Sequence, residues 1–138
     1  MAKDRLSDGE YEALSNLRYT LRRFMDFSTS AAQQEWLPAQ QHQALLAIRG
    51  HRGEAMTVGK LAERLLIAPH SATELVGRLA AAGYVTRNVD PADRRRQTLL
   101  LTDKAAVVLE QLSGIHLTEI RDLAPKLLDI LKKLEEGR

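Results

Sequence analysis

The stretch YVTRNVDPADRRRQTLLLT, residues 84–102, constrains the fold of this chain more than any other. Both of its ends alternate apolar and polar residues, which predicts two strands, and DPADRRR between them predicts the loop of a β-hairpin. Three consecutive arginines, Arg94, Arg95 and Arg96, would lie at the tip of that hairpin. Like charges on a protruding loop repel one another and bury no apolar surface. They therefore contribute little to folding and indicate a surface that meets an anionic partner.

Two short helices are predicted immediately before the hairpin. Thr57 can cap a helix over VGKLAERLL, and Pro69 is placed at the start of a second helix that Gly83 ends. A tight connection between two such helices is typical of a helix-turn-helix, and a hairpin directly after it makes a winged helix. The apolar residues of the second helix recur at helical spacing and are expected to face the core: Ala72, Leu75, Val76 and Leu79.

A long helix is predicted on the N-terminal side, over residues 7–35. Ser7 and Glu10 have the spacing of a capping box, which marks the start of this helix. Pro38 is a natural first residue for the helix that follows. The apolar residues of the long helix form a narrow seam typical of helix-on-helix packing: Leu14, Leu17, Leu21 and Phe24. The alternative is an ordinary amphipathic helix that packs on the chain's own core.

Two further helices are predicted after the hairpin, over residues 103–136, with Pro125 separating them. The predicted fold class is therefore mainly α with a small β-hairpin wing. A chain of 138 residues is expected to form one domain, residues 1–138, in which residues 38–102 are the winged-helix lobe.

The charge is distributed unevenly along the chain. Residues 49–96 carry nine Lys or Arg and five Asp or Glu, whereas the rest of the chain carries eleven and thirteen. This local basic excess is typical of a surface that binds a polyanion. The sequence has no cysteine, which excludes disulfides and thiolate metal sites, and no apolar run long enough to span a membrane. Its charged start does not resemble a secretory signal, so we expect a cytoplasmic location.

The outer face of the second helix fits the major groove of DNA, which admits one α-helix. Gly77 and Ala81 keep this face slim, so that the helix can approach closely. For Ser71 and Glu74 there is an alternative, because SATE has capping-box spacing and the pair could simply cap the helix. The side chains available for contacts with bases are His70, Ser71, Thr73, Glu74 and Arg78.

The arginines of the hairpin loop gain energy when phosphates or an electronegative minor groove replace water. Asp93 is two residues before Arg95 and can fix the direction of its side chain. The alternative is that Asp90, Asp93 and the arginines form a solvated charge network on an ordinary hairpin.

The residues from about Val58 to Thr102 resemble the winged-helix core of the MarR family of bacterial transcriptional regulators. The resemblance rests on RLAAAGYVTR (78–87), on DPADRR (90–95) and on Leu99, Leu101 and Thr102. Ala105 departs from the family pattern, since many members have glycine after the Leu-Thr pair, and a helix start tolerates this change.

The resemblance implies a homodimer in which residues 7–35 and 103–136 interlock, so that two winged-helix lobes bind a pseudo-palindromic operator in double-stranded DNA. The second helix of the motif would read the major groove. A wing arginine would enter the minor groove, either Arg95 with Asp93 beside it or Arg94. Thr57, Lys60 and Arg87 would contact phosphates.

The resemblance also implies a small effector, often an aromatic acid or phenol, between the dimer helices and the winged-helix lobe. Candidate residues would combine aromatic walls with a cation: Tyr19, Arg22, Phe24, Trp36 and His42. Plain packing is the alternative, and it is favoured for Phe24 and Trp36. His42 and His116 raise a metal alternative, but neither has a local ligand partner, so no metal and no cofactor are predicted.

The sequence therefore predicts a sequence-specific DNA-binding transcriptional regulator, a repressor that a small molecule releases from its operator. The alternative is a winged-helix module that binds another protein without specific DNA binding. No nucleophile with a base and no paired carboxylates form a catalytic motif, so we predict that the chain is not an enzyme.

Overall fold

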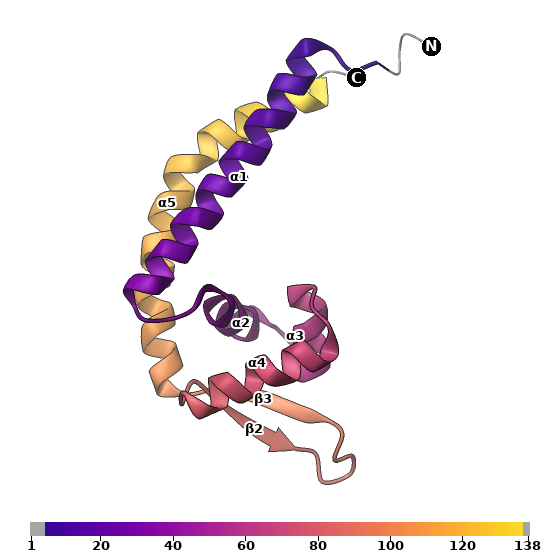
Figure 1. Cartoon of the computed structure of the whole chain (residues 1–138), viewed down its shortest axis with the longest axis vertical. Helices are drawn as coiled ribbons and strands as arrows, with labels where there is room; N and C mark the ends of the chain where they lie inside the picture. The colour runs from indigo at the N-terminus through magenta and orange to yellow at the C-terminus, as the bar shows by residue number, and fades with distance from the viewer. Residues whose placement is uncertain (1–4, 137–138) are drawn as a thin grey trace. The chain divides into compact units, whose positions relative to one another are not determined.

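The computed structural model describes residues 5–136, which fall into two compact units. One unit comprises residues up to Ala31 together with those from Gly114 onward, and the other comprises Ala32–Ser113. The predicted fold class, mainly α with a small β-hairpin wing, is confirmed, and the two-residue strand β1 adds a third strand to the hairpin. Residues 1–4 and 137–138 of the predicted domain lie outside the described residues. The elements in chain order are α1 (Asp8–Gln34), α2 (Ala39–Gly50), β1 (Met56–Thr57), α3 (Val58–Leu65), α4 (Pro69–Ala81), β2 (Val85–Val89), β3 (Gln97–Leu101) and α5 (Asp103–Glu136) (Figure 1).

The unit Ala32–Ser113 is a winged helix, in which α2, α3 and α4 pack with a three-stranded antiparallel sheet. The strand order is β1-β3-β2, so the stub β1 pairs with the central strand, with Met56 opposite Leu99. The long partner of β3 is β2, paired from Val85 with Leu101 to Val89 with Gln97. Figure 1 shows the loop between β2 and β3 projecting beyond the helices of this unit.

Helix α4 begins and ends where the sequence predicts. Pro69 occupies the first turn, where its missing N–H needs no partner. Gly83 follows the end of the helix with φ of +82°, a left-handed conformation that glycine adopts without steric cost. The four residues predicted to face the core are all buried: Ala72, Leu75, Val76 and Leu79.

Helix α3 is capped as predicted, because the Thr57 side chain accepts a hydrogen bond from the backbone N–H of Lys60 at 3.2 Å. It ends at Leu65, and the C-cap residue Leu66 has a φ of +57°. A left-handed conformation is unfavourable for a residue with a Cβ, and Leu66 is also 92% exposed. The turn between α3 and α4 therefore contains a strained residue whose side chain contributes little to the core.

In the other unit α1 begins with the predicted capping box. The Glu10 N–H donates to Ser7 Oγ at 3.1 Å, and the Ser7 N–H donates to Glu10 Oε1 at 2.9 Å. The unit is held together by contacts between the C-terminal part of α1 and α5. His116 Nε2 lies 2.8 Å from Ser28 Oγ, and the His116 ring meets Phe24 edge to face at a centroid distance of 6.0 Å.

The apolar residues predicted to form one seam on α1 lie on two different faces of the helix, one covered and one exposed. Ala13 and Thr20 are buried, and Leu17 and Phe24 share their face and are half-buried. Leu14 and Leu21 remain exposed, at 38% and 47%. A spacing of three and four residues is compatible with both faces. Within the chain, only the face of Leu17 and Phe24 is covered.

The prediction of two helices after the hairpin is wrong, because α5 continues from Asp103 to Glu136 through Pro125. Proline removes one backbone hydrogen bond and disturbs the preceding turn. Packing outweighs this loss, since the half-buried and buried positions continue on either side of the proline, at Leu123, Leu127 and Ile130.

Candidate nucleic-acid interface

Helix α4 presents a polar outer face to solvent. The residues opposite its buried side, His70, Thr73, Glu74 and Arg78, are all exposed, and Ser71 is half-buried at the margin. The interpretation of Ser71 and Glu74 as a cap is wrong, because Pro69 starts the helix earlier and Ala68 takes the N-cap position without a side-chain hydrogen bond. Glu74 instead forms an ion pair with Arg78 one turn later, at 3.8 Å.

The hydrogen bonds of this face define what it can offer a ligand. The Thr73 hydroxyl donates to the Pro69 carbonyl at 3.1 Å, so its hydrogen is already used. Thr73 therefore presents a methyl group and an acceptor oxygen. Arg78 presents guanidinium donors that Glu74 restrains only loosely. Such a set can contact base edges, which offer amino groups, carbonyls and a thymine methyl in the major groove.

Gly77 lies on the same outer face, and nothing inside the unit requires a glycine there. Its φ is not in the left-handed region, and a Cβ added at this position would meet no atom within 4 Å. Glycine inside a helix is less favourable than alanine by roughly 0.5–1 kcal/mol. The physical advantage of Gly77 is therefore the space that it leaves outside the helix.

The loop between β2 and β3, residues 90–96, is ordered by its two aspartates. Asp90 Oδ1 accepts from the Ala92 N–H at 2.9 Å, and Asp93 Oδ1 accepts from the Arg95 N–H at 3.1 Å. The backbone closes the loop as well, since the N–H of Asp90 donates to the Arg96 carbonyl at 3.0 Å. A short arginine-rich loop thus has a defined backbone without help from burial.

The three arginines of this loop have different surroundings. Arg95 is 94% exposed at its side chain, and its Nε lies 3.5 Å from Asp93 Oδ1, as the sequence predicts for an oriented arginine. Arg94 is exposed as well. Arg96 instead turns toward the helices, where its guanidinium lies 4.0 Å from Glu54. Arg94 and Arg95 are therefore the two arginines that the loop presents outward.

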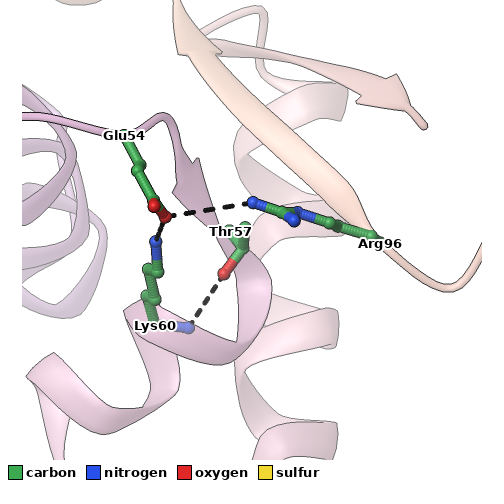
Figure 2. A network of polar contacts seen from close by, with 4 residues as sticks. All are labelled: Glu54, Thr57, Lys60 and Arg96. Carbon is green, nitrogen blue, oxygen red and sulfur yellow. Dashed lines mark hydrogen bonds and ion pairs between the residues drawn. The ribbon is translucent and has the colours of Figure 1, made fainter. Parts of the chain in front are cut away.

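Figure 2 shows a polar cluster where the loop meets α3. Glu54, in the segment between α2 and β1, accepts a hydrogen bond from Lys60 Nζ at 2.8 Å and also faces Arg96. The hydrogen bond and charge of Lys60, followed by the charge of Arg96, lower the pKa of the Glu54 carboxyl. The carboxylate is therefore ionised at neutral pH. No sequence signal points to Glu54, because it belongs to no motif and one of its partners, Arg96, is distant along the chain.

The remaining predicted contacts are accessible to different degrees. Arg87 is exposed on β2, whereas Thr57 and Lys60 are half-buried at the start of α3. Since α3, α4 and the sheet pack against one another, all the predicted DNA-binding residues belong to one compact unit.

The predicted effector residues are divided between the two units. Tyr19 and Arg22 line one shallow hollow on α1, with Leu21 and Met25. Trp36 is 93% exposed and His42 is buried, both in the winged-helix unit.

A metal site and a membrane-spanning helix are both absent from the described residues. Over residues 5–136 no three His, Cys, Asp or Glu side chains are grouped in a way that could hold a metal ion. None of the helices in the same range has the length and apolar character needed to cross a membrane.

Comparisons with known proteins agree with this geometry. Residues 37–96 match the model of the MarR family. A curated relative, the uncharacterized HTH-type transcriptional regulator YcgE of Bacillus subtilis, is 47% identical over 45 residues, which are 33% of this chain and 29% of the relative. The chain thus matches less than a third of that relative's length.

Solved structures show the same fold over most of the chain. AbsC, a MarR family transcriptional regulator from Streptomyces coelicolor, superimposes with a TM-score of 0.76 at 20% identity, covering 96% of this chain and 90% of AbsC. The MepR–DNA complex of S. aureus gives a TM-score of 0.66 at 19% identity, covering 81% of this chain and 79% of MepR. The resemblance to the MarR family, predicted from the sequence, is therefore confirmed over residues 37–96 by the family match, and the solved structures confirm the fold.

Proposed function

We propose that this chain is a sequence-specific DNA-binding transcriptional regulator. The observation that carries the proposal is the pairing, within one unit, of a helix with an exposed polar outer face and a loop that presents Arg94 and Arg95 outward. Helix α4 enters the major groove, and the loop, acting as a wing, places its outward arginines against phosphates or in the minor groove. MepR, which shares the fold, has been solved bound to DNA.

The residues proposed to bind DNA fall into two groups. His70, Thr73 and Arg78 contact base edges, with Glu74 and Ser71 beside them. The remaining residues bind the phosphate backbone or the minor groove: Thr57, Lys60, Arg87, Asp93, Arg94, Arg95 and Arg96, with Asp93 acting through Arg95.

The proposal includes a homodimer formed by the unit of α1 and α5. Both helices carry exposed apolar side chains at spacings of three, four, seven or eight residues, which place them on one face of each helix, and the chain itself does not cover these faces. These are Tyr11, Leu14, Leu21 and Met25 on α1, and Leu117, Ile120, Leu128 and Leu131 on α5. Exposed apolar surface of this extent favours burial against a second copy. Two copies would present two winged-helix units to a pseudo-palindromic operator.

We also propose that the regulator is a cytoplasmic repressor that a small aromatic acid or phenol releases from DNA. In the hollow on α1, Tyr19 supplies aromatic surface and Arg22 supplies a cation for a carboxylate. Benzoate is a simple probe of this class. It should weaken DNA binding by the wild-type chain and have less effect on Arg22→Ala.

The wing tests the proposed function directly. The double substitution Arg94→Ala and Arg95→Ala should weaken binding to a duplex selected from a random pool by the wild-type chain. The slope of log K against log salt should become flatter by about 0.9 for each phosphate that the variant no longer neutralises. Fluorescence anisotropy at several salt concentrations measures both quantities.

A matched control removes two exposed charges from the other unit, Arg121→Ala with Lys132→Ala on α5. It should leave the salt slope nearly unchanged. Unaltered affinity and slope in the wing variant would show that the wing does not bind DNA. A wild-type chain that selects no duplex would favour the alternative function, docking to another protein.

A further inference from the structure

The carboxylate of Glu54 contacts cations from two separate elements of the winged-helix unit (Figure 2). It lies 2.8 Å from Lys60 Nζ in the first turn of α3 and 4.0 Å from the guanidinium of Arg96 at the end of the wing loop. Glu54 belongs to neither element, since it precedes β1. One side chain therefore connects the wing loop to α3.

A carboxylate at this place opposes DNA binding by its charge alone, because it would repel nearby phosphates. It cannot relieve that repulsion by taking up a proton near neutral pH, since Lys60 and Arg96 keep its pKa below the ordinary value. The side chain is also 74% exposed, so it contributes little to the core. Any contribution of Glu54 to function therefore acts through its contacts with Lys60 and Arg96.

We propose that Glu54 is a positioning residue that holds the Lys60 and Arg96 side chains in place before DNA binds. A free lysine or arginine loses rotamer entropy when it binds a phosphate, and a side chain already held in one geometry loses less. The backbone of Arg96 is fixed as well, because its N–H donates to the Asp93 carbonyl at 3.0 Å. This inference rests on the proposed DNA-binding function and names the residue that organises two of its cations.

Positioning and plain charge repulsion predict opposite results for Glu54→Gln, which keeps the size of the side chain and removes its charge. Repulsion alone predicts tighter DNA binding. Positioning predicts binding weaker by about two- to five-fold, the range expected for exposed ion pairs. Glu63→Gln is the matched control, because Glu63 is an exposed carboxylate on α3, the helix that carries Lys60. It should bind DNA as tightly as the wild type or slightly more tightly.

A double-mutant cycle tests whether Glu54 acts through its two partners. In the background Lys60→Gln with Arg96→Gln, the substitution Glu54→Gln should no longer weaken binding, because only the relief of repulsion remains. The probes are a 30-base-pair duplex selected from a random pool by the wild-type chain and a random duplex of equal length. Unchanged melting temperatures would show that all variants are folded.

The outcomes separate this inference from the function on which it rests. Weaker binding by Glu54→Gln that disappears in the double background supports positioning. Equal or tighter binding by Glu54→Gln, or a loss that persists in the double background, overturns positioning while DNA binding itself stands. A wild-type chain that selects no duplex overturns the proposed function and this inference together.

Discussion

Replacing Gly77 by alanine should stabilise the protein and weaken its binding to DNA. The two effects have different origins. Inside the unit an added methyl group meets no atom within 4 Å, so nothing has to move to accommodate it. Outside the unit the same methyl group protrudes from the face of α4 that we propose to lie in the major groove.

The gain in stability follows from helix propensity. Alanine in a helix interior is favoured over glycine by roughly 0.5–1 kcal/mol. For a chain of this size that corresponds to a rise in melting temperature of about 1–4 °C.

The loss in binding depends on how closely the helix approaches the base pairs. Inserting one methyl group into a well-packed contact costs about 1–3 kcal/mol. Since 1.4 kcal/mol corresponds to about a factor of ten, the affinity for the selected duplex should fall about 5- to 150-fold for each helix in the groove.

The assay pairs thermal unfolding with fluorescence anisotropy on the selected duplex. Gly114→Ala is the control, because Gly114 lies in α5, in the other unit, and also has no atom within 4 Å of an added Cβ. Both variants should melt at a higher temperature than the wild type, and only Gly77→Ala should bind DNA less tightly. Undiminished binding by Gly77→Ala would refute the close approach of this face to DNA.

Two further predictions concern the proposed dimer and the strained turn. Leu21→Asp should shift the mass measured by light scattering from two chains toward one, since it places a charge among the exposed apolar residues of α1. The control Leu46→Asp, at a similarly exposed leucine of α2, should leave the mass unchanged. An unaltered mass for Leu21→Asp would place the interface elsewhere. Leu66→Gly should stabilise the fold by up to about 1 kcal/mol in thermal unfolding, because relief of the left-handed strain, about 1–2 kcal/mol, exceeds the entropy that glycine gains in the unfolded chain. A lower melting temperature would mean that the exposed Leu66 side chain stabilises the folded state.

Elements whose signals are local could be predicted from the sequence. The Ser7–Glu10 box, the Thr57 cap and Pro69 each act within one turn of helix, and each defines a helix start in the structure. The strands on either side of the loop were also predictable, because alternation over five or six residues has no helical equivalent.

Predictions failed where packing between distant segments outweighs a local rule. Pro125 is a helix breaker by its chemistry, yet α5 continues through it because the residues around it share one buried face. Leu17 and Leu21 fit the same seam by spacing, but only Leu17 lies on the face that the chain covers.

The candidate site was predictable in its parts but not in its connections. The outward arginine with its aspartate follows from residues two positions apart, Asp93 and Arg95. Glu54 could not be identified in this way. Its role depends on Arg96, which is close to it only after the hairpin has folded back on α3.

The most direct test of the central claim is a binding competition at physiological ionic strength with the wild-type chain. A labelled duplex selected from a random pool is challenged with an excess of unlabelled random duplex, and the mass of the complex is measured in parallel. We expect two chains on each duplex, retained against the competitor and released as salt is raised. A single chain on the duplex, or equal displacement by random and selected competitors, would contradict the proposal that a paired winged helix reads a DNA sequence.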